Sequence, residues 1–93
     1  MDVSFTWAEA KREANLAKHG LDFRDVERVF GGATATVEDR RFWYGEKRYI
    51  TLGLLHHLPV CIAHTEYAEE IRIISFRKAT RREGQTWFEE VAH

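Results

Sequence analysis

The second half of the chain alternates apolar and polar residues with a period of two, and this pattern limits the possible folds more than any other feature. Three segments carry the alternation, at residues 33–39, 47–55 and 71–77, and residues 60–66 are largely apolar on both faces, as in a buried strand. A period of two indicates β-strands. The connections between them are turns or a hairpin loop, too short for a crossover, so neighbouring strands must run antiparallel. The sequence therefore predicts an antiparallel sheet.

The start of the chain predicts a further strand and a first helix. Residues 3–7, VSFTW, alternate in the same way and indicate a half-buried strand. Thr6 and Glu9 have the spacing of a capping box that would start the helix, and Gly20 has the chemistry of a helix stop. The apolar residues of this helix recur on one narrow face, which we expect to be buried: Ala10, Ala14, Ala17 and Leu21.

Two more helices are indicated by their caps. Asp22 is a good N-cap for a second helix that ends at Gly31, and a capping box of Thr80 and Glu83 starts a third. The second helix has an apolar stripe of Phe23, Val26, Val29 and Phe30. The predicted order is β-α-α-β-β-β-β-α, an α+β fold with helices packed on the antiparallel sheet.

Composition indicates a small soluble protein. The 93 residues suffice for one domain, residues 1–93, and 44% of them are hydrophobic and 31% charged. No apolar run is long enough to span a bilayer and the first residues lack a secretion signal, so we expect a cytoplasmic protein without a membrane contact. The single cysteine, Cys61, excludes an internal disulfide and is expected to be buried.

The net charge is −1, yet the cations are unevenly distributed. Five cations and no acid occur in one stretch: Arg72, Arg77, Lys78, Arg81 and Arg82. Arg77 ends a predicted strand just before the third helix, whose free N–H groups favour an anion. Arg81 and Arg82 would extend this anion site, and a bound anion would offset the cost of cations at a helix start. The alternative is a solvated basic surface.

A second candidate site lies in NLAKHG, residues 15–20. On a helix, Lys11, Asn15 and Lys18 share one face about 100° from the alanine stripe, so they flank the buried side where a cleft against the sheet would lie. His19 ends the helix, where the helix dipole favours a charged imidazole suited to act as an acid. The alternative is that Lys18 and His19 only bind the last carbonyl groups of the helix.

Glu46 and Arg48 form a third candidate. Arg48 shares strand parity with Ile50 and Leu52, so we expect it to point toward the buried face, where a guanidinium needs a partner. That partner is either the carboxylate of Glu46 or a phosphate, and the pattern does not choose between them. Glu46 is also a candidate general base.

The sequence shows no metal-ligand pattern. His56 and His57 are adjacent and point apart on a strand, and no acid or cysteine stands at ligand spacing from them. A glycine-rich phosphate loop and a nucleophile elbow are also absent from the sequence. We expect neither a metal nor a cofactor.

Several motifs occur in a fixed order along nearly the whole chain. They are Phe5-x-Trp7, Lys11-x-x-x-Asn15-x-x-Lys18-His19-Gly20-x-x-Phe23, Glu46-x-Arg48 leading to Gly53, and IRIISFRKATRRE. Together they resemble the BrnT family of toxins. The resemblance implies a fold related to RelE-type ribonuclease toxins, RNA cleavage that needs no metal, and a hetero-oligomer with a neutralising BrnA-like antitoxin that supplies DNA binding. Ala8 departs from the family, which has an acid after the tryptophan.

RNA cleavage without a metal uses the 2′-hydroxyl as nucleophile and requires a base, an acid and cations around the phosphorane. Our first hypothesis is therefore an endoribonuclease toxin in which Arg48 and Arg77 hold the phosphate. Proton transfer and positioning are expected from four residues, with base and acid not assigned: Lys11, Lys18, His19 and Glu46. Further RNA contacts are expected from Asn15, Trp43, Lys78, Arg81 and Arg82, and Trp43 is the aromatic residue expected to stack on a base.

Two other hypotheses stay open on the sequence. The same basic cleft would serve a binding module that holds RNA, or acidic residues of an antitoxin, without cutting RNA; the near-zero net charge and the unassigned acid–base pair favour this view. A weaker third hypothesis is an inactive structural subunit.

Overall fold

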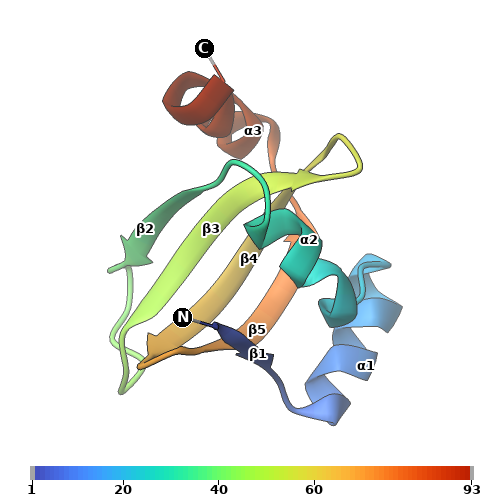
Figure 1. The fold of residues 1–93 in the computed structure, drawn as a ribbon, viewed down its shortest axis with the longest axis vertical. Helices are drawn as coiled ribbons and strands as arrows, with labels where there is room; N and C mark the ends of the chain where they lie inside the picture. Colours follow the sequence, from blue (N-terminus) through green and yellow to red (C-terminus); the bar gives the residue numbers. More distant parts are fainter. Residues whose placement is uncertain (1, 93) are drawn as a thin grey trace.

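The computed structural model describes residues 2–92, which form a five-stranded β-sheet with three α-helices around it (Figure 1). The order of strands and helices is the predicted one, so the α+β class is confirmed. Within the described residues, no helix is both long and apolar enough to cross a membrane. The elements are β1 (Ser4–Thr6), α1 (Glu9–His19), a 3-10 turn (Phe23–Asp25) leading into α2 (Val26–Phe30), β2 (Ala35–Asp39), β3 (Arg48–Leu55), β4 (Leu58–Tyr67), β5 (Glu70–Lys78), α3 (Arg81–Trp87) and a π-helical turn (Phe88–Ala92).

The sheet has the strand order β1-β5-β4-β3-β2. Strands β2 to β5 form the antiparallel meander that the short connections predict. Strand β1 instead pairs parallel with β5, with Ser4 beside Glu70 and Thr6 beside Arg72. The prediction of an entirely antiparallel sheet is therefore wrong for β1. A short turn forces an antiparallel pair, whereas β1 reaches β5 through most of the chain, so its direction is free.

The main core lies between α2 and one face of the sheet. Phe23, Val26 and Val29 of the predicted stripe are buried against strand residues that include Val60, Ile62, Ile73 and Phe76. Asp22 caps the turn as predicted, since its carboxylate accepts the Arg24 N–H at 3.0 Å. Helix and sheet approach so closely that a Cβ on Gly53 would stand 2.8 Å from a Val29 methyl group.

Helix α1 ends as predicted but begins and packs differently. Gly20 adopts the left-handed conformation (φ 72°), and its N–H binds the Leu16 carbonyl. The N-cap is Ala8, which makes no side-chain hydrogen bond, and the Thr6 hydroxyl has no partner among the described residues, so the predicted capping box is wrong. The alanine stripe is also exposed, because α1 lies beside the edge of β5 and not on a face of the sheet (Figure 1).

Asn15 is the residue by which α1 contacts that edge. Its Nδ2 donates to the Phe76 carbonyl at 2.8 Å and to the Leu21 carbonyl at 3.0 Å, while its Oδ1 accepts the Phe76 N–H at 3.0 Å. The side-chain amide thus pairs with both backbone groups of Phe76, as a neighbouring strand would. Asn15 is only 8% exposed. It extends the edge pairing where the short β1 no longer reaches.

At the other end of the sheet, the predicted capping box starts α3. Thr80 Oγ1 accepts the Glu83 N–H at 3.1 Å, and the Glu83 carboxylate accepts the Thr80 N–H at 2.8 Å. The Trp87 indole N–H donates to the Ala33 carbonyl at 3.0 Å, which fixes the helix to the chain entering β2. Figure 1 shows α3 across the end of the sheet.

A chain of polar side chains runs from the buried His64 and Thr51 beneath α2 to the exposed Thr36 on β2. His64 Nε2 and Thr51 Oγ1 lie 2.7 Å apart, and Thr51 Oγ1 and Thr36 Oγ1 are also 2.7 Å apart. The Phe30 ring meets His64 edge-on, with centroids 5.3 Å apart. Burial lowers the pKa of His64 to about 4, so the imidazole is neutral at physiological pH.

Replacing Asn15 with alanine should destabilise the fold by about 3 kcal/mol, because two buried backbone groups of Phe76 lose their partner. Urea unfolding measures the change. Glu13→Ala, an exposed position on the same helix, is the control and should stay within about 0.5 kcal/mol of the parent protein. An Asn15→Ala midpoint equal to that of Glu13→Ala would contradict the role given to the amide.

Lowering the pH from 7.5 to 5 should reduce the free energy of unfolding by about 2 kcal/mol through His64. The folded-state pKa lies below the unfolded value, so the unfolded chain binds the proton first and stability falls as the pH drops through this range. His64→Gln should flatten the profile, whereas the exposed turn variant His57→Asn should keep it. NMR titration of the parent protein provides a second measurement: protonation of His64 above pH 6 would refute the prediction.

Candidate active site: a basic cleft beside β5

Two adjoining hollows lie between α1 and the sheet, each of about 230 Å³. Lys11 and Ile74 line both of them. The first also includes Arg48 and Arg72, and the second includes Lys18 and His19. We call this combined surface the basic cleft and define it by Lys11, Lys18, His19, Arg48 and Arg72.

Helix α1 supplies one wall of the basic cleft. Lys11 and Lys18 lie one turn before and one turn after Asn15, so the docking of Asn15 turns both lysines toward the sheet. Among the ion pairs of residues 2–92, none involves either lysine. His19 is half-buried at the end of the helix. The structure therefore places Lys11, Lys18 and His19, all three predicted as site residues of this helix, along one wall.

Arg48 supplies part of the other wall, from the sheet face opposite the main core. Its neighbour Tyr49 stacks on the core residue His64, with ring centroids 6.0 Å apart, so Arg48 projects the other way. The expectation that Arg48 points toward the buried face is wrong. Strand β3 is apolar on both faces, and parity alone could not show which face the helices cover. The Arg48 guanidinium carbon lies 4.0 Å from the centre of the Tyr44 ring.

Glu46 lies between two guanidinium groups. Its Oε2 is 2.7 Å from an Arg72 nitrogen and 3.9 Å from Arg48 Nε, so the predicted pair with Arg48 is the longer of two contacts. Arg48 Nε is buried without a hydrogen-bond partner among the described residues. The basic cleft thus holds four cations, and only the two arginines among them contact the carboxylate of Glu46. Such a cluster of cations attracts a phosphate.

Arg72 is the member of the cleft that sequence reasoning missed. Strict alternation along β5 groups Arg72 with Phe76, which is fully buried in the core. A bulge opposite Ala63 and His64 shifts the alternation, so that Phe76 and Ile73 both face the core. Arg72 consequently lies on the open face with Arg48. The stretch of five cations includes Arg72 and indicated a basic surface, but the sequence did not predict the bulge that places Arg72 on the open face.

Arg77 does not line either hollow, because Glu83 holds it. Its two terminal nitrogens lie 2.8 and 3.0 Å from the two carboxylate oxygens, and one also donates to the Lys78 carbonyl at 3.1 Å. The Arg77 guanidinium lowers the pKa of Glu83 to about 2. The anion expected at the start of α3 is therefore a carboxylate of the chain itself.

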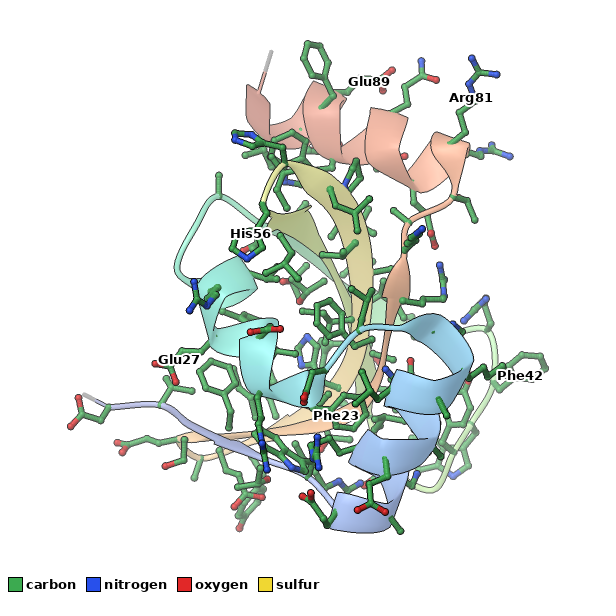
Figure 2. The ribbon with its side chains drawn as sticks, turned by 90° about the vertical axis from the view of Figure 1, so that its right-hand side faces the viewer. Phe23, Glu27, Phe42, His56, Arg81 and Glu89 are labelled. Atoms are coloured by element: carbon green, nitrogen blue, oxygen red, sulfur yellow. The ribbon has the colours of Figure 1, made fainter. Side chains whose placement is uncertain are left out.

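Arg77 and Arg48 also lie at different levels of the sheet. In the register of the sheet, Arg77 is paired with Cys61 on β4, and Cys61 with Leu52 on β3. Leu52 is four residues from Arg48, so Arg77 lies about 13 Å further along the strands than Arg48 does. Lys78, Arg81 and Arg82 are exposed around the start of α3, and Arg81 projects away from the sheet (Figure 2). The structure separates these cations from the basic cleft.

Two other candidates have different surroundings. Asn15, expected to contact RNA, lines the second hollow, and its side-chain amide is bound to the backbone of Phe76 and Leu21. Trp43 is 77% exposed in the loop 40–47.

Within residues 2–92, no group of three or more His, Cys, Asp or Glu side chains is arranged so that it could hold a metal ion.

The sequence model of the family described as ribonuclease toxin, BrnT, of type II toxin–antitoxin systems matches residues 7–83. The chain belongs to the BrnT family. The matched range includes every residue of the basic cleft and ends at Glu83, the partner of Arg77. As a BrnT-family protein it is a ribonuclease toxin of a type II toxin–antitoxin system, a class that has an antitoxin partner.

A solved structure agrees with this assignment. The crystal structure of the Brucella abortus ribonuclease toxin BrnT is 26% identical in sequence, with a TM-score of 0.69. The similarity covers 85% of this chain and 99% of that one. No curated protein matches the chain. The BrnT resemblance found in the sequence motifs is thereby confirmed at the level of the family and of the fold.

Proposed function

We propose that this BrnT-family protein is an endoribonuclease that cleaves RNA at the basic cleft without a metal ion. The observation that carries the proposal is that α1, β3 and β5 bring cations to one surface. Lys11 lines a hollow with Arg48 and Arg72, Lys18 lines the adjoining hollow, and the two arginines flank Glu46. A phosphodiester needs cations to stabilise the phosphorane, and its cleavage through the 2′-hydroxyl needs a proton acceptor and a proton donor.

We assign phosphate binding to Arg48 and Arg72. Both guanidinium groups flank Glu46, and the fork of a guanidinium matches two phosphate oxygens. An entering phosphate would compete with Glu46 for Arg72 and release the carboxylate beside the reacting group. Glu46 is then our candidate to take the proton of the 2′-hydroxyl, as its oxygen attacks phosphorus.

The opposite wall would complete the reaction. Lys11, Lys18 and His19 are the candidates to protonate the leaving 5′-oxygen, since all three carry donors and line the same cleft. The products would be a 2′,3′-cyclic phosphate and a free 5′-hydroxyl. Arg77, Lys78, Arg81 and Arg82 would contact backbone phosphates outside the cleft, with Arg77 available only when Glu83 releases it.

The partner proposals rest on the family. A BrnA-like antitoxin would neutralise the toxin by covering the basic cleft, in a hetero-oligomer in which the antitoxin carries the DNA-binding module. Without the antitoxin, the toxin would cleave RNA in the cytoplasm, where messenger RNA is translated, and so inhibit growth.

The test is incubation of the purified protein with single-stranded RNA in EDTA. The parent protein should cut the RNA, and Arg48→Ala with Arg72→Ala should slow cleavage by at least about 100-fold, because both phosphate-binding groups are lost. Arg28→Ala is the control: Arg28 is an exposed arginine of α2, a helix on the core face of the sheet, and its loss should leave the rate unchanged. Absence of cleavage, or a double variant as active as the parent, would refute the proposal.

Glu46→Gln separates catalysis from binding. The amide cannot accept a proton, so kcat should fall by about 100-fold. RNA affinity should hold or rise, because a negative charge leaves the cleft. The two quantities come from single-turnover kinetics and from binding to RNA with 2′-O-methyl groups. A parent protein that binds RNA tightly but never cuts it would instead support the binding-module hypothesis.

A further inference from the structure

The loop 40–47, between β2 and β3, exposes two neighbouring aromatic side chains to solvent. Phe42 is 67% exposed and Trp43 is 77% exposed. Figure 2 shows Phe42 projecting away from the body of the protein. Adjacent exposed aromatic rings keep a large apolar surface in water, which is unfavourable unless a ligand covers them.

The base of this loop is held by an ion pair. The Asp39 carboxylate accepts hydrogen bonds from Arg41 Nε at 2.9 Å and from an Arg41 terminal nitrogen at 3.0 Å. The Tyr44 hydroxyl donates to the same carboxylate at 3.3 Å. The Arg41 guanidinium lowers the pKa of Asp39 to about 2, so this contact persists at physiological pH. The loop therefore presents its aromatic rings on a fixed frame.

The same loop leads directly into the basic cleft. The Phe42 ring meets the Tyr44 ring edge-on, with centroids 6.0 Å apart. The Arg48 guanidinium lies over the Tyr44 ring, 4.0 Å from its centroid. Glu46, near the end of the loop, binds Arg72. A ligand whose phosphate is held by Arg48 would thus have its neighbouring group beside Tyr44 and Phe42, with Trp43 between them in the loop.

We propose that Trp43, with its chain neighbour Phe42, forms a stacking platform for one unpaired base next to the phosphate held by Arg48 and Arg72. This inference rests on the proposed function. It defines the substrate class as single-stranded RNA, because bases inside an A-form duplex are stacked on one another and cannot reach an aromatic side chain. The platform reads the flat face of the base and is therefore tolerant of base identity.

The alternation of cations and aromatic rings along the loop favours RNA over a protein segment as the occupant. Three cations and three acids line a hollow with Trp43, and each acid already has an arginine partner. Asp39 binds Arg41, Glu46 binds Arg72, and Glu38 lies 3.5 Å from Arg40. Aromatic rings interleaved with cations are typical of surfaces that track a single strand.

The first measurement is binding to a fluorescent single-stranded RNA that carries 2′-O-methyl groups. This RNA is not cleaved, because a methylated 2′-oxygen cannot act as the nucleophile. Trp43→Ala should weaken binding by about 5- to 150-fold, and Trp43→Phe should restore most of it. The matched control is Phe88→Ala, an exposed aromatic residue that follows α3, and it should bind like the parent. Tryptophan fluorescence of the parent should be quenched by RNA, and Trp43→Phe should lose that quenching.

The second measurement is cleavage of unmodified RNA and of RNA lacking one base beside the cut site. The parent should cut the complete RNA faster than Trp43→Ala does, and the two proteins should cut the abasic RNA equally. Duplex RNA should show no dependence on Trp43. Equal activity of both proteins on the complete strand would overturn the platform and leave the proposed nuclease intact.

The two proposals fail in different ways. Trp43 quenching and Trp43-dependent binding without any cleavage would reject the nuclease and support the platform. A Trp43→Ala protein that handles RNA normally but binds the antitoxin less tightly would overturn the platform, because the surface would then belong to a protein interface.

Discussion

Strand β5 carries the edge on which the rest of the structure depends. Strand β1 covers only three residues of it, and beyond Thr6 the backbone groups of β5 need another partner. Asn15 provides that partner with a single side chain, whose amide supplies both a donor and an acceptor to Phe76. An amide is suited to this position because it matches the two groups of a peptide, whereas an apolar residue would leave both unpaired.

This mode of docking explains why α1 breaks the usual amphipathic rule. Its alanines are exposed and its inward side is polar, since the helix meets a strand edge and not an apolar face. The absence of an apolar seam leaves room beside the sheet for Lys11 and Lys18. The same contact that completes the sheet therefore sets the distance between the lysines of α1 and the arginines of β3 and β5.

The parts of this fold that follow from neighbouring residues could be predicted from the sequence. The strands of the meander, the cap at Asp22, the capping box at Thr80 and the stop at Gly20 all depend on contacts within a few positions. The parts that depend on distant residues could not. The bulge near His64 determines which face Arg72 occupies, and Arg48 lies on the face of β3 opposite α2, which strand parity alone does not identify.

The candidate site shows the same division. Grouping Lys11 with Lys18, and Glu46 with Arg48, needed only helix and strand periodicity. Arg77 was expected to meet the same phosphate, but its sequence position did not reveal that Glu83 both caps α3 and binds the guanidinium. The carboxylate was correctly predicted as a cap, and its second contact required the turn between β5 and α3 to be folded.

The contact between Asn15 and Phe76 joins positions 61 residues apart in the chain. One wall of the basic cleft is made early in translation and the other nearly last. A nascent chain that ends before β5 lacks Arg72 and cannot dock α1, so it has no assembled cleft. The surface that we propose as the nuclease site therefore needs almost the whole chain, and a chain that stops before β5 cannot present it.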